Sequence, residues 1–109
     1  MSKKIDMWPI QIQDSDLENN QGEKCREIWL TSGLRMVAVV FARLADIAPE
    51  LLIPPKRPEG AYGGVLRHYA VIENSDENDG SDGLPRGARA KKVRLVTLED
   101  IEPAKKTTG

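Results

Sequence analysis

The densest group of side chains that could do chemistry is an acidic stretch, ENSDENDGSDG, at residues 73–83. Carboxylate and amide oxygens suit Ca²⁺, and an EF-hand loop ends on a bidentate glutamate at its position 12. A loop that starts at Asp76 has Gly87 at that position, and one that starts at Asn74 has Pro85 there. The stretch is therefore predicted to be a solvated connector, with weak and unspecific cation binding as the alternative.

A basic run, RGARAKKVR at residues 86–94, follows the acidic stretch directly. Its five cations could contact phosphates, but it has no aromatic side chain that could stack on a base. The net charge of the chain is −1, so the acidic neighbours would repel nucleic acid or fold back onto the cations. The two stretches together predict a charged contact surface for another protein, made of Asp76, Glu77, Asp79, Asp82, Arg86, Arg89, Lys91 and Lys92.

Cys25 and His68 are the one cysteine and the one histidine of the chain, so they are the candidates for a nucleophile and its base. Nothing around Cys25 resembles a nucleophile elbow or a protease signature. One cysteine and one histidine also leave a zinc tetrahedron incomplete. The chain has no glycine loop of the kind that holds a nucleotide. We therefore expect no metal and no cofactor.

The elements that must position these residues begin with a short strand at residues 8–13, where apolar and polar side chains alternate. Residues 17–48 are predicted to be helical, because six apolar residues separated by four and three positions form one stripe: Leu30, Leu34, Val37, Phe41, Leu44 and Ala48. Gly33 leaves an alternative open. It could end a first helix, and residues 34–42, rich in β-branched side chains, could then form a buried strand.

The second half of the chain is predicted to be a β-hairpin with a long connector. Residues 49–60 contain four prolines, which favours an extended crossing. Residues 65–74 and 91–100 have strand character and are expected to pair antiparallel. Residues 75–90 would then form a flexible loop between them.

These elements predict one α+β domain over residues 1–109, with an N-terminal helical segment packed on a small antiparallel sheet that carries a long acidic hairpin connector. The tails 1–7 and 104–109 are predicted to be disordered. With 39% hydrophobic and 30% charged residues, the composition is typical of a small globular domain. The longest apolar run, residues 36–42, is too short to cross a membrane.

For function, the lack of a catalytic motif favours a non-enzymatic protein-interaction module, such as a small accessory subunit or a bacterial or viral inhibitor of a larger complex. Nucleic-acid binding through residues 86–94 is one alternative, and a small Cys-dependent enzyme is another. A homodimer is also predicted, through Leu30, Leu34, Val37 and Phe41 on the helical stripe. The single cysteine and the lack of an apolar leader favour a cytoplasmic location.

Overall fold

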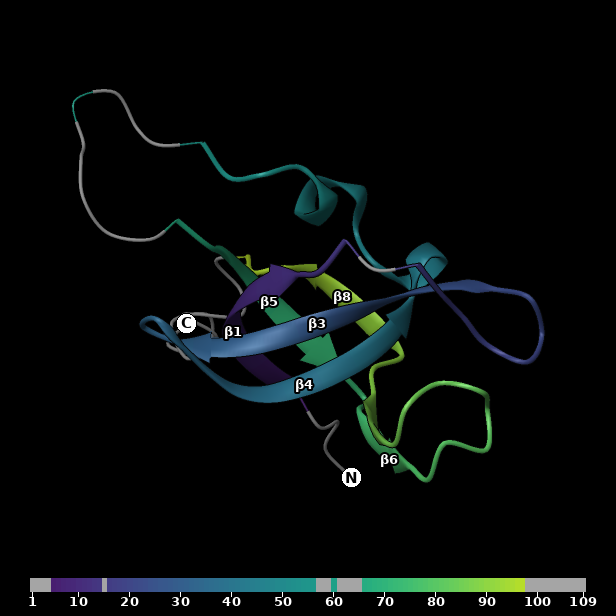
Figure 1. Ribbon diagram of the computed structural model, residues 1–109. Helices are drawn as coiled ribbons and strands as arrows, with labels where there is room; N and C mark the ends of the chain where they lie inside the picture. Colours follow the sequence, from purple (N-terminus) through teal and green to yellow (C-terminus); the bar gives the residue numbers. More distant parts are fainter. Residues whose placement is uncertain (1–4, 15, 57–59, 61–65, 98–109) are drawn as a thin grey trace, which may run out of the picture.

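The computed structural model describes residues 5–14, 16–56, 60 and 66–97, and strands dominate this part of the chain (Figure 1). Two short 3₁₀ helices, η1 and η2, lie between the fourth and fifth strands. In chain order the elements are β1 (Ile5–Ile12), β2 (Leu17–Glu18), β3 (Lys24–Ser32), β4 (Arg35–Arg43), η1 (Leu44–Asp46), η2 (Pro49–Leu52), β5 (His68–Glu73), β6 (Asp76–Asn78), β7 (Gly87–Arg89) and β8 (Lys92–Leu95).

The predicted helical segment 17–48 is wrong, and with it the α+β class, because this segment forms β2, β3, β4 and η1. Gly33, with a φ of +63°, begins the two-residue loop that joins β3 to β4, and Ser32 pairs with Arg35 across it. Glycine at the first central position is typical of a type II′ hairpin turn. The expected stripe is divided accordingly, since Leu30 is buried whereas Leu34 is exposed at the turn.

The sheet closes on itself. In order across the sheet, β4, β3, β1, β5 and β8 lie side by side, each antiparallel to the next. β7 pairs parallel with β4, and β7 and β8 belong to the same run of chain, residues 87–95. This run therefore joins β4 to β5 and completes a barrel of five strand positions. The Ala90 N–H donates to the Phe41 carbonyl (3.0 Å) and the Ala48 N–H donates to the Val93 carbonyl (2.9 Å) along this seam.

Other strand predictions are confirmed. The strand expected at residues 8–13 lies largely within β1. The antiparallel pairing expected between the two C-terminal strands is present between β5 and β8, where Ala70 lies opposite Leu95 and Glu73 opposite Lys92.

The predicted flexible loop, residues 75–90, contains two short strands, β6 and β7, which pair antiparallel with each other. Of the predicted tails, residues 5–7 lie in β1, whereas 1–4 and 104–109 are outside the described residues.

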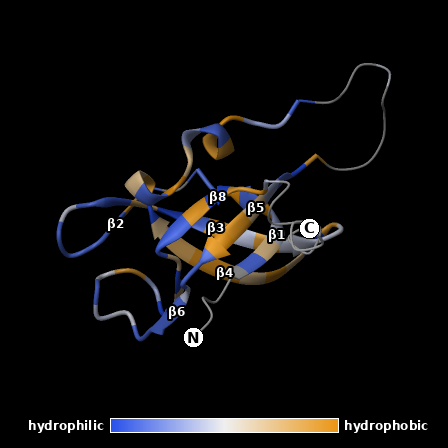
Figure 2. Cartoon of the chain, turned by 180° about the vertical axis from the view of Figure 1, so that it is seen from behind, coloured by the Kyte–Doolittle hydropathy of each residue, from blue (hydrophilic) through white to orange (hydrophobic). Residues whose placement is uncertain are grey.

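Two apolar clusters hold the fold together. The larger fills the barrel and takes residues from β1, β3, β4, β5 and β8, among them Ile10, Ile28, Val40, Ile72 and Val93. Figure 2 shows hydrophobic residues, in orange, along the strands of the barrel. The smaller cluster lies on the outer face of β3 and β4, where the connector between β6 and β7 covers the sheet, and consists of Cys25, Phe41 and Leu84.

Candidate functional site

The acidic stretch uses its side-chain oxygens on its own backbone. Asn78, Asp79 and Asp82 each accept a hydrogen bond from the backbone N–H two residues further on, at 2.8 to 3.1 Å. Such Asx turns fix a loop without any ligand. The stretch is also fastened to the loop before β3, because the Asn20 N–H donates to the Asp82 carbonyl at 2.7 Å. The connector is thus held by its backbone hydrogen bond to Asn20 and by the packing of Leu84 in the smaller apolar cluster.

Asp82 and Arg89, two of the predicted contact residues, bind each other. The Arg89 Nε and Nη2 donate to the two Asp82 carboxylate oxygens at 2.7 and 2.9 Å. The guanidinium carbon also lies 5.1 Å from the centre of the Phe41 ring, within the range of a cation–π contact. The hydrogen bonds from Arg89 lower the pKa of Asp82 from 3.8 to about 2. This pair therefore helps to hold the connector in place.

The Asp82–Arg89 pair makes stability depend on pH in the acid range. A carboxyl whose pKa is lower in the folded protein stabilises the fold above its unfolded pKa, here 3.8, and this contribution is lost as the pH falls through about 2. We expect Asp82→Asn to flatten the dependence of the unfolding free energy on pH between these values, measured by urea denaturation at several pH values. Glu77→Gln, at an exposed position of β6, is the matched control. Curves of equal slope for wild type and Asp82→Asn would contradict this role.

The other predicted contact residues lie on the connector and on residues 87–95, the run that completes the barrel, which we call the closing strand. Asp76, Glu77 and Asp79 are exposed on or beside β6, and Arg86, Lys91 and Lys92 are exposed along residues 86–92. Arg94, the last cation of the basic run, instead donates to the Glu73 carboxylate of β5 at 2.6 Å. The structure therefore divides the basic run into three exposed cations, Arg86, Lys91 and Lys92, and two arginines, Arg89 and Arg94, that bind carboxylates of the chain itself.

Cys25 and His68 are not brought together. Cys25 is buried under the connector, where its thiol contacts the Glu23 carbonyl at 3.5 Å and burial raises its pKa. His68 begins β5 and lines a different cavity, where its Nε2 donates to the Ile53 carbonyl. A cysteine with a raised pKa holds less of the reactive thiolate at neutral pH.

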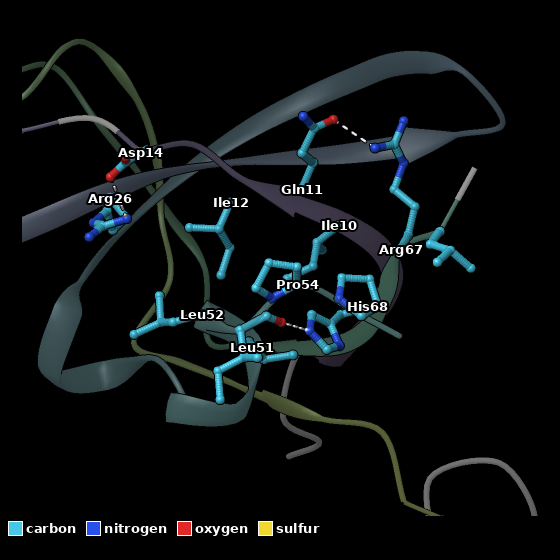
Figure 3. A pocket seen from close by; sticks show the side chains of 13 residues that line it. Ile10, Gln11, Ile12, Asp14, Arg26, Leu51, Leu52, Pro54, Arg67 and His68 are labelled. Carbon is cyan, nitrogen blue, oxygen red and sulfur yellow. Dashed lines mark hydrogen bonds and ion pairs between the residues drawn. The ribbon is translucent and has the colours of Figure 1, made fainter. Parts of the chain in front are cut away.

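A groove of about 530 Å³ lies between β1 and the chain that follows η1. We call it the β1–η2 groove. Figure 3 shows Arg26 with Asp14 on one side of it and Arg67 with Gln11 on the other. Its apolar surface comes from Ile10, Ile12, Leu51, Leu52, Pro54 and Pro55. Apolar lining with a few polar groups is typical of a binding site.

Both arginines of the groove have few or long hydrogen bonds and ion pairs. Arg67 donates from Nη1 to the Gln11 amide oxygen at 2.7 Å, and its buried Nε has no hydrogen-bond partner. Arg26 donates to the Gln13 carbonyl at 3.3 Å and lies 3.5 Å from a carboxylate oxygen of Asp14. The Asp14 side chain is fully exposed, so water screens this ion pair strongly. The groove therefore contains two positive charges that are poorly neutralised.

The groove could not be recognised from the sequence. Its residues come from β1, β3, η2, β5 and the chain beside them, and none forms a motif with its neighbours in sequence. The proline-rich segment gave a partial signal. It was expected to be an extended crossing, and Pro54 and Pro55 form one wall of the groove, but residues 49–52 form η2. His68 anchors this wall through its bond to the Ile53 carbonyl.

A second surface feature is the tip of the β3–β4 hairpin. Leu34 is 79% exposed, Met36 46% and Val37 47%. Leu34 and Val37 belong to the predicted dimer seam, but its other members, Leu30 and Phe41, are buried within the chain. We call the three exposed residues Leu34, Met36 and Val37 the hairpin tip.

No family model matches the chain, and neither the curated proteins nor the solved structures contain a match to it. Among the residues that the structure describes, no group of three or more His, Cys, Asp or Glu side chains could hold a metal ion. The same part of the chain contains no helix of the length and apolarity that a membrane crossing requires.

Proposed function

We propose that this protein is a non-enzymatic protein-interaction module, in the manner of a small accessory subunit or of an inhibitor of a larger complex. The observation that supports this most is the hairpin tip, where three apolar side chains within four residues of sequence face solvent. Contiguous exposed apolar side chains often mark a surface that another protein covers. We also place the protein in the cytoplasm, a proposal supported by its single, buried cysteine.

The construction of the hairpin suits this role. β3 and β4 pair from Cys25 and Arg43 to Ser32 and Arg35, with one register shift between Leu30 and Thr31, so the tip is supported by two paired strands. A rigid apolar surface loses little conformational entropy when a partner binds. Methionine is also enriched where proteins contact one another, because its side chain adapts to different shapes. Met36 at the tip fits this pattern.

We expect Leu34→Asp combined with Val37→Asp to abolish partner binding without unfolding the protein. Both side chains are at least 47% exposed, so the barrel interior is left unchanged. Partner binding would be measured by quantitative affinity enrichment from cells with the tagged wild type and the double variant. A Lys24→Gln/Lys56→Gln variant, at two exposed lysines outside the hairpin tip and the predicted contact surface, lowers the net charge by the same amount and is the control.

Two results would contradict the role of the hairpin tip. One is equal enrichment of the same proteins by the wild type and by the tip variant, provided both unfold at the same temperature. The other is enrichment of no protein by the wild type. A second copy of this chain as the partner would appear as a dimer in analytical ultracentrifugation that the tip variant converts to a monomer.

Nucleic-acid binding is the second candidate, and the barrel itself favours it. OB-folds are also five-stranded barrels, and they bind single strands on one outer face between two loops. In this chain the outer face of β3 carries Trp29, but its indole N–H donates to the Glu27 carboxylate at 2.7 Å. The adjacent connector adds Asp76, Asp79 and Asp82. This negative charge weighs against a phosphate backbone, so we rank the candidate second.

The two candidates differ in their dependence on salt. Binding of a single-stranded oligonucleotide that weakens steeply with salt, and that is lost in Lys91→Glu/Lys92→Glu, would favour the nucleic-acid candidate. Partner binding through the apolar hairpin tip should change little with salt. No feature of the structure gives comparable support to a Cys-dependent enzyme, since Cys25 is covered by Leu84 and the connector.

A further inference from the structure

We propose that the β1–η2 groove binds an extended segment of a partner protein in which acidic residues flank an apolar residue. This inference rests on the proposed function and specifies the chemistry of the partner. The groove is separate from the hairpin tip: it involves Ile10–Ile12 of β1 and the chain around η2, whereas the tip lies beyond the β3–β1 pairing that ends at Leu30. A partner can therefore contact both surfaces.

The apolar part of the groove sets the first requirement. Ile12 and Leu52 are partly exposed there, and Pro54 and Pro55 form a stiff wall that needs little ordering when a ligand binds. The volume of about 530 Å³ is within the range of ligand sites, roughly 300 to 1,000 Å³. It accommodates an apolar side chain and the backbone that carries it.

Arg67 sets the second requirement. Its buried Nε–H has no acceptor, and its Nη1 is held by the neutral amide of Gln11. In the described part of the chain no ion pair joins Arg67 to a carboxylate. A carboxylate accepts strong, charge-assisted hydrogen bonds from a guanidinium, so an acidic ligand side chain would supply the missing negative charge beside Arg67.

Arg26 provides the matching charge at the other end. Its ion pair with Asp14 is 3.5 Å long, and Asp14 is exposed on the chain just after β1. A ligand carboxylate can replace Asp14 there, because Asp14 loses little when it turns into solvent. The ligand would thus meet a cation at each end and apolar surface between them.

The spacing of the anchors defines the ligand further. Gln11 and Asp14, which contact the two arginines, are three residues apart, so they are separated by at most about 11 Å. An extended peptide places residues four positions apart on the same face, roughly 13 Å apart, with the residue midway between them on that face too. Flexible arginine side chains can span the small difference. The favoured ligand is therefore acid–x–apolar–x–acid in extended form.

The test measures binding of the peptide acetyl-SEVIVES-amide to the full chain by isothermal titration calorimetry. The control peptide, acetyl-SQVIVQS-amide, has glutamine at both acidic positions. We expect the acidic peptide to bind at least about tenfold more tightly, and Arg67→Gln to remove this preference. Arg26→Gln should do the same, which keeps the test available if one variant fails to fold. Arg35→Gln, an exposed arginine of the hairpin, should leave the preference unchanged.

Several outcomes would overturn the groove inference. They are equal binding of the two peptides, no binding of either by the wild type, and an unchanged preference in Arg67→Gln. Tighter binding of decanoate than of the acidic peptide would assign the site to a lipid instead. The proposed function is tested independently, because Leu34→Asp/Val37→Asp should lose the cellular partner yet still bind the acidic peptide. If the acidic peptide does not bind but the wild type still captures its partner through the hairpin tip, the groove inference alone is overturned.

Discussion

Replacement of Ile28 by alanine is expected to lower the free energy of unfolding by about 2 to 5 kcal/mol. Ile28 has no exposed surface and lies on the central strand β3, where it is opposite Ile12 of β1 and Val40 of β4. The truncation leaves a cavity that three strands enclose, and closed barrels have little freedom to collapse around such a space. Because small domains are stabilised by only about 5 to 15 kcal/mol, urea denaturation should show a large shift of the midpoint.

Leu34→Ala is the matched control for this substitution. It removes a side chain of similar size from the same hairpin, but at a position that is 79% exposed, so the expected change is within about 0.5 kcal/mol. The contrast between the two variants also tests the fold itself. If residues 17–48 formed the predicted helix, Leu34 would be buried beside Leu30. Leu34→Ala would then be the substitution that lowers the free energy of unfolding most. A larger loss of stability for Leu34→Ala than for Ile28→Ala would contradict the barrel.

Gly83→Ala is expected to cost about 2 to 4 kcal/mol and to loosen the contact between the connector and the loop before β3. Gly83 has a φ of +96°, which strains any residue with a Cβ. A Cβ there would also lie 2.4 Å from the Asn20 side-chain oxygen and 3.1 Å from its backbone nitrogen. To make room, Asn20 must give up its hydrogen bond to the Ser81 carbonyl. Urea denaturation would give the cost, and amide hydrogen exchange would locate it.

Gly33→Ala separates the two causes. Gly33 also has a positive φ, of +63°, but no atom lies within 4 Å of its added Cβ. This control should therefore show only the backbone strain, about 1 to 2 kcal/mol. The difference between the two variants measures the close approach of the connector to Asn20. Equal losses, with unchanged protection of the Asn20 amide, would show that the connector is not held there.

The strands that pair most simply could be predicted from the sequence. Residues 10–13 and 92–95 alternate apolar and polar side chains, and this alternation has no helical counterpart, whereas β5 is a short run of strand-forming residues. The region of β3 and β4 was wrongly predicted to be helical. A spacing of four and three residues puts apolar residues on one face of a helix, but it mixes odd and even positions, which lie on opposite faces of a strand. Leu30 and Val40 face the interior of the barrel, but Phe41 faces outward into the smaller cluster. The β-branched residues and Gly33 were the better indicators, since they describe a hairpin and its turn.

The candidate sites were predictable only where the residues are neighbours in sequence. The acidic stretch directly precedes the basic run, so contact between them was foreseeable, and Asp82 and Arg89 make it. The groove gave no such signal. Arg26 and Arg67 are ordinary charged residues until the pairing of β1 with both β3 and β5 places them at the two ends of one cavity. Pairings between distant strands are decided by the whole fold and not by local sequence.

The closing strand has a consequence for how the chain folds during synthesis. The β3–β4 hairpin is local and can form early, but β4 and β5 acquire their last neighbour only when residues 87–95 arrive. Until the ribosome has released them, both strands present unpaired backbone groups that can recruit other chains. A slower release of residues 87–95 from the ribosome would prolong this interval. Aggregation of nascent chains should therefore depend on how fast these residues are released, even though the finished barrel has these edges covered.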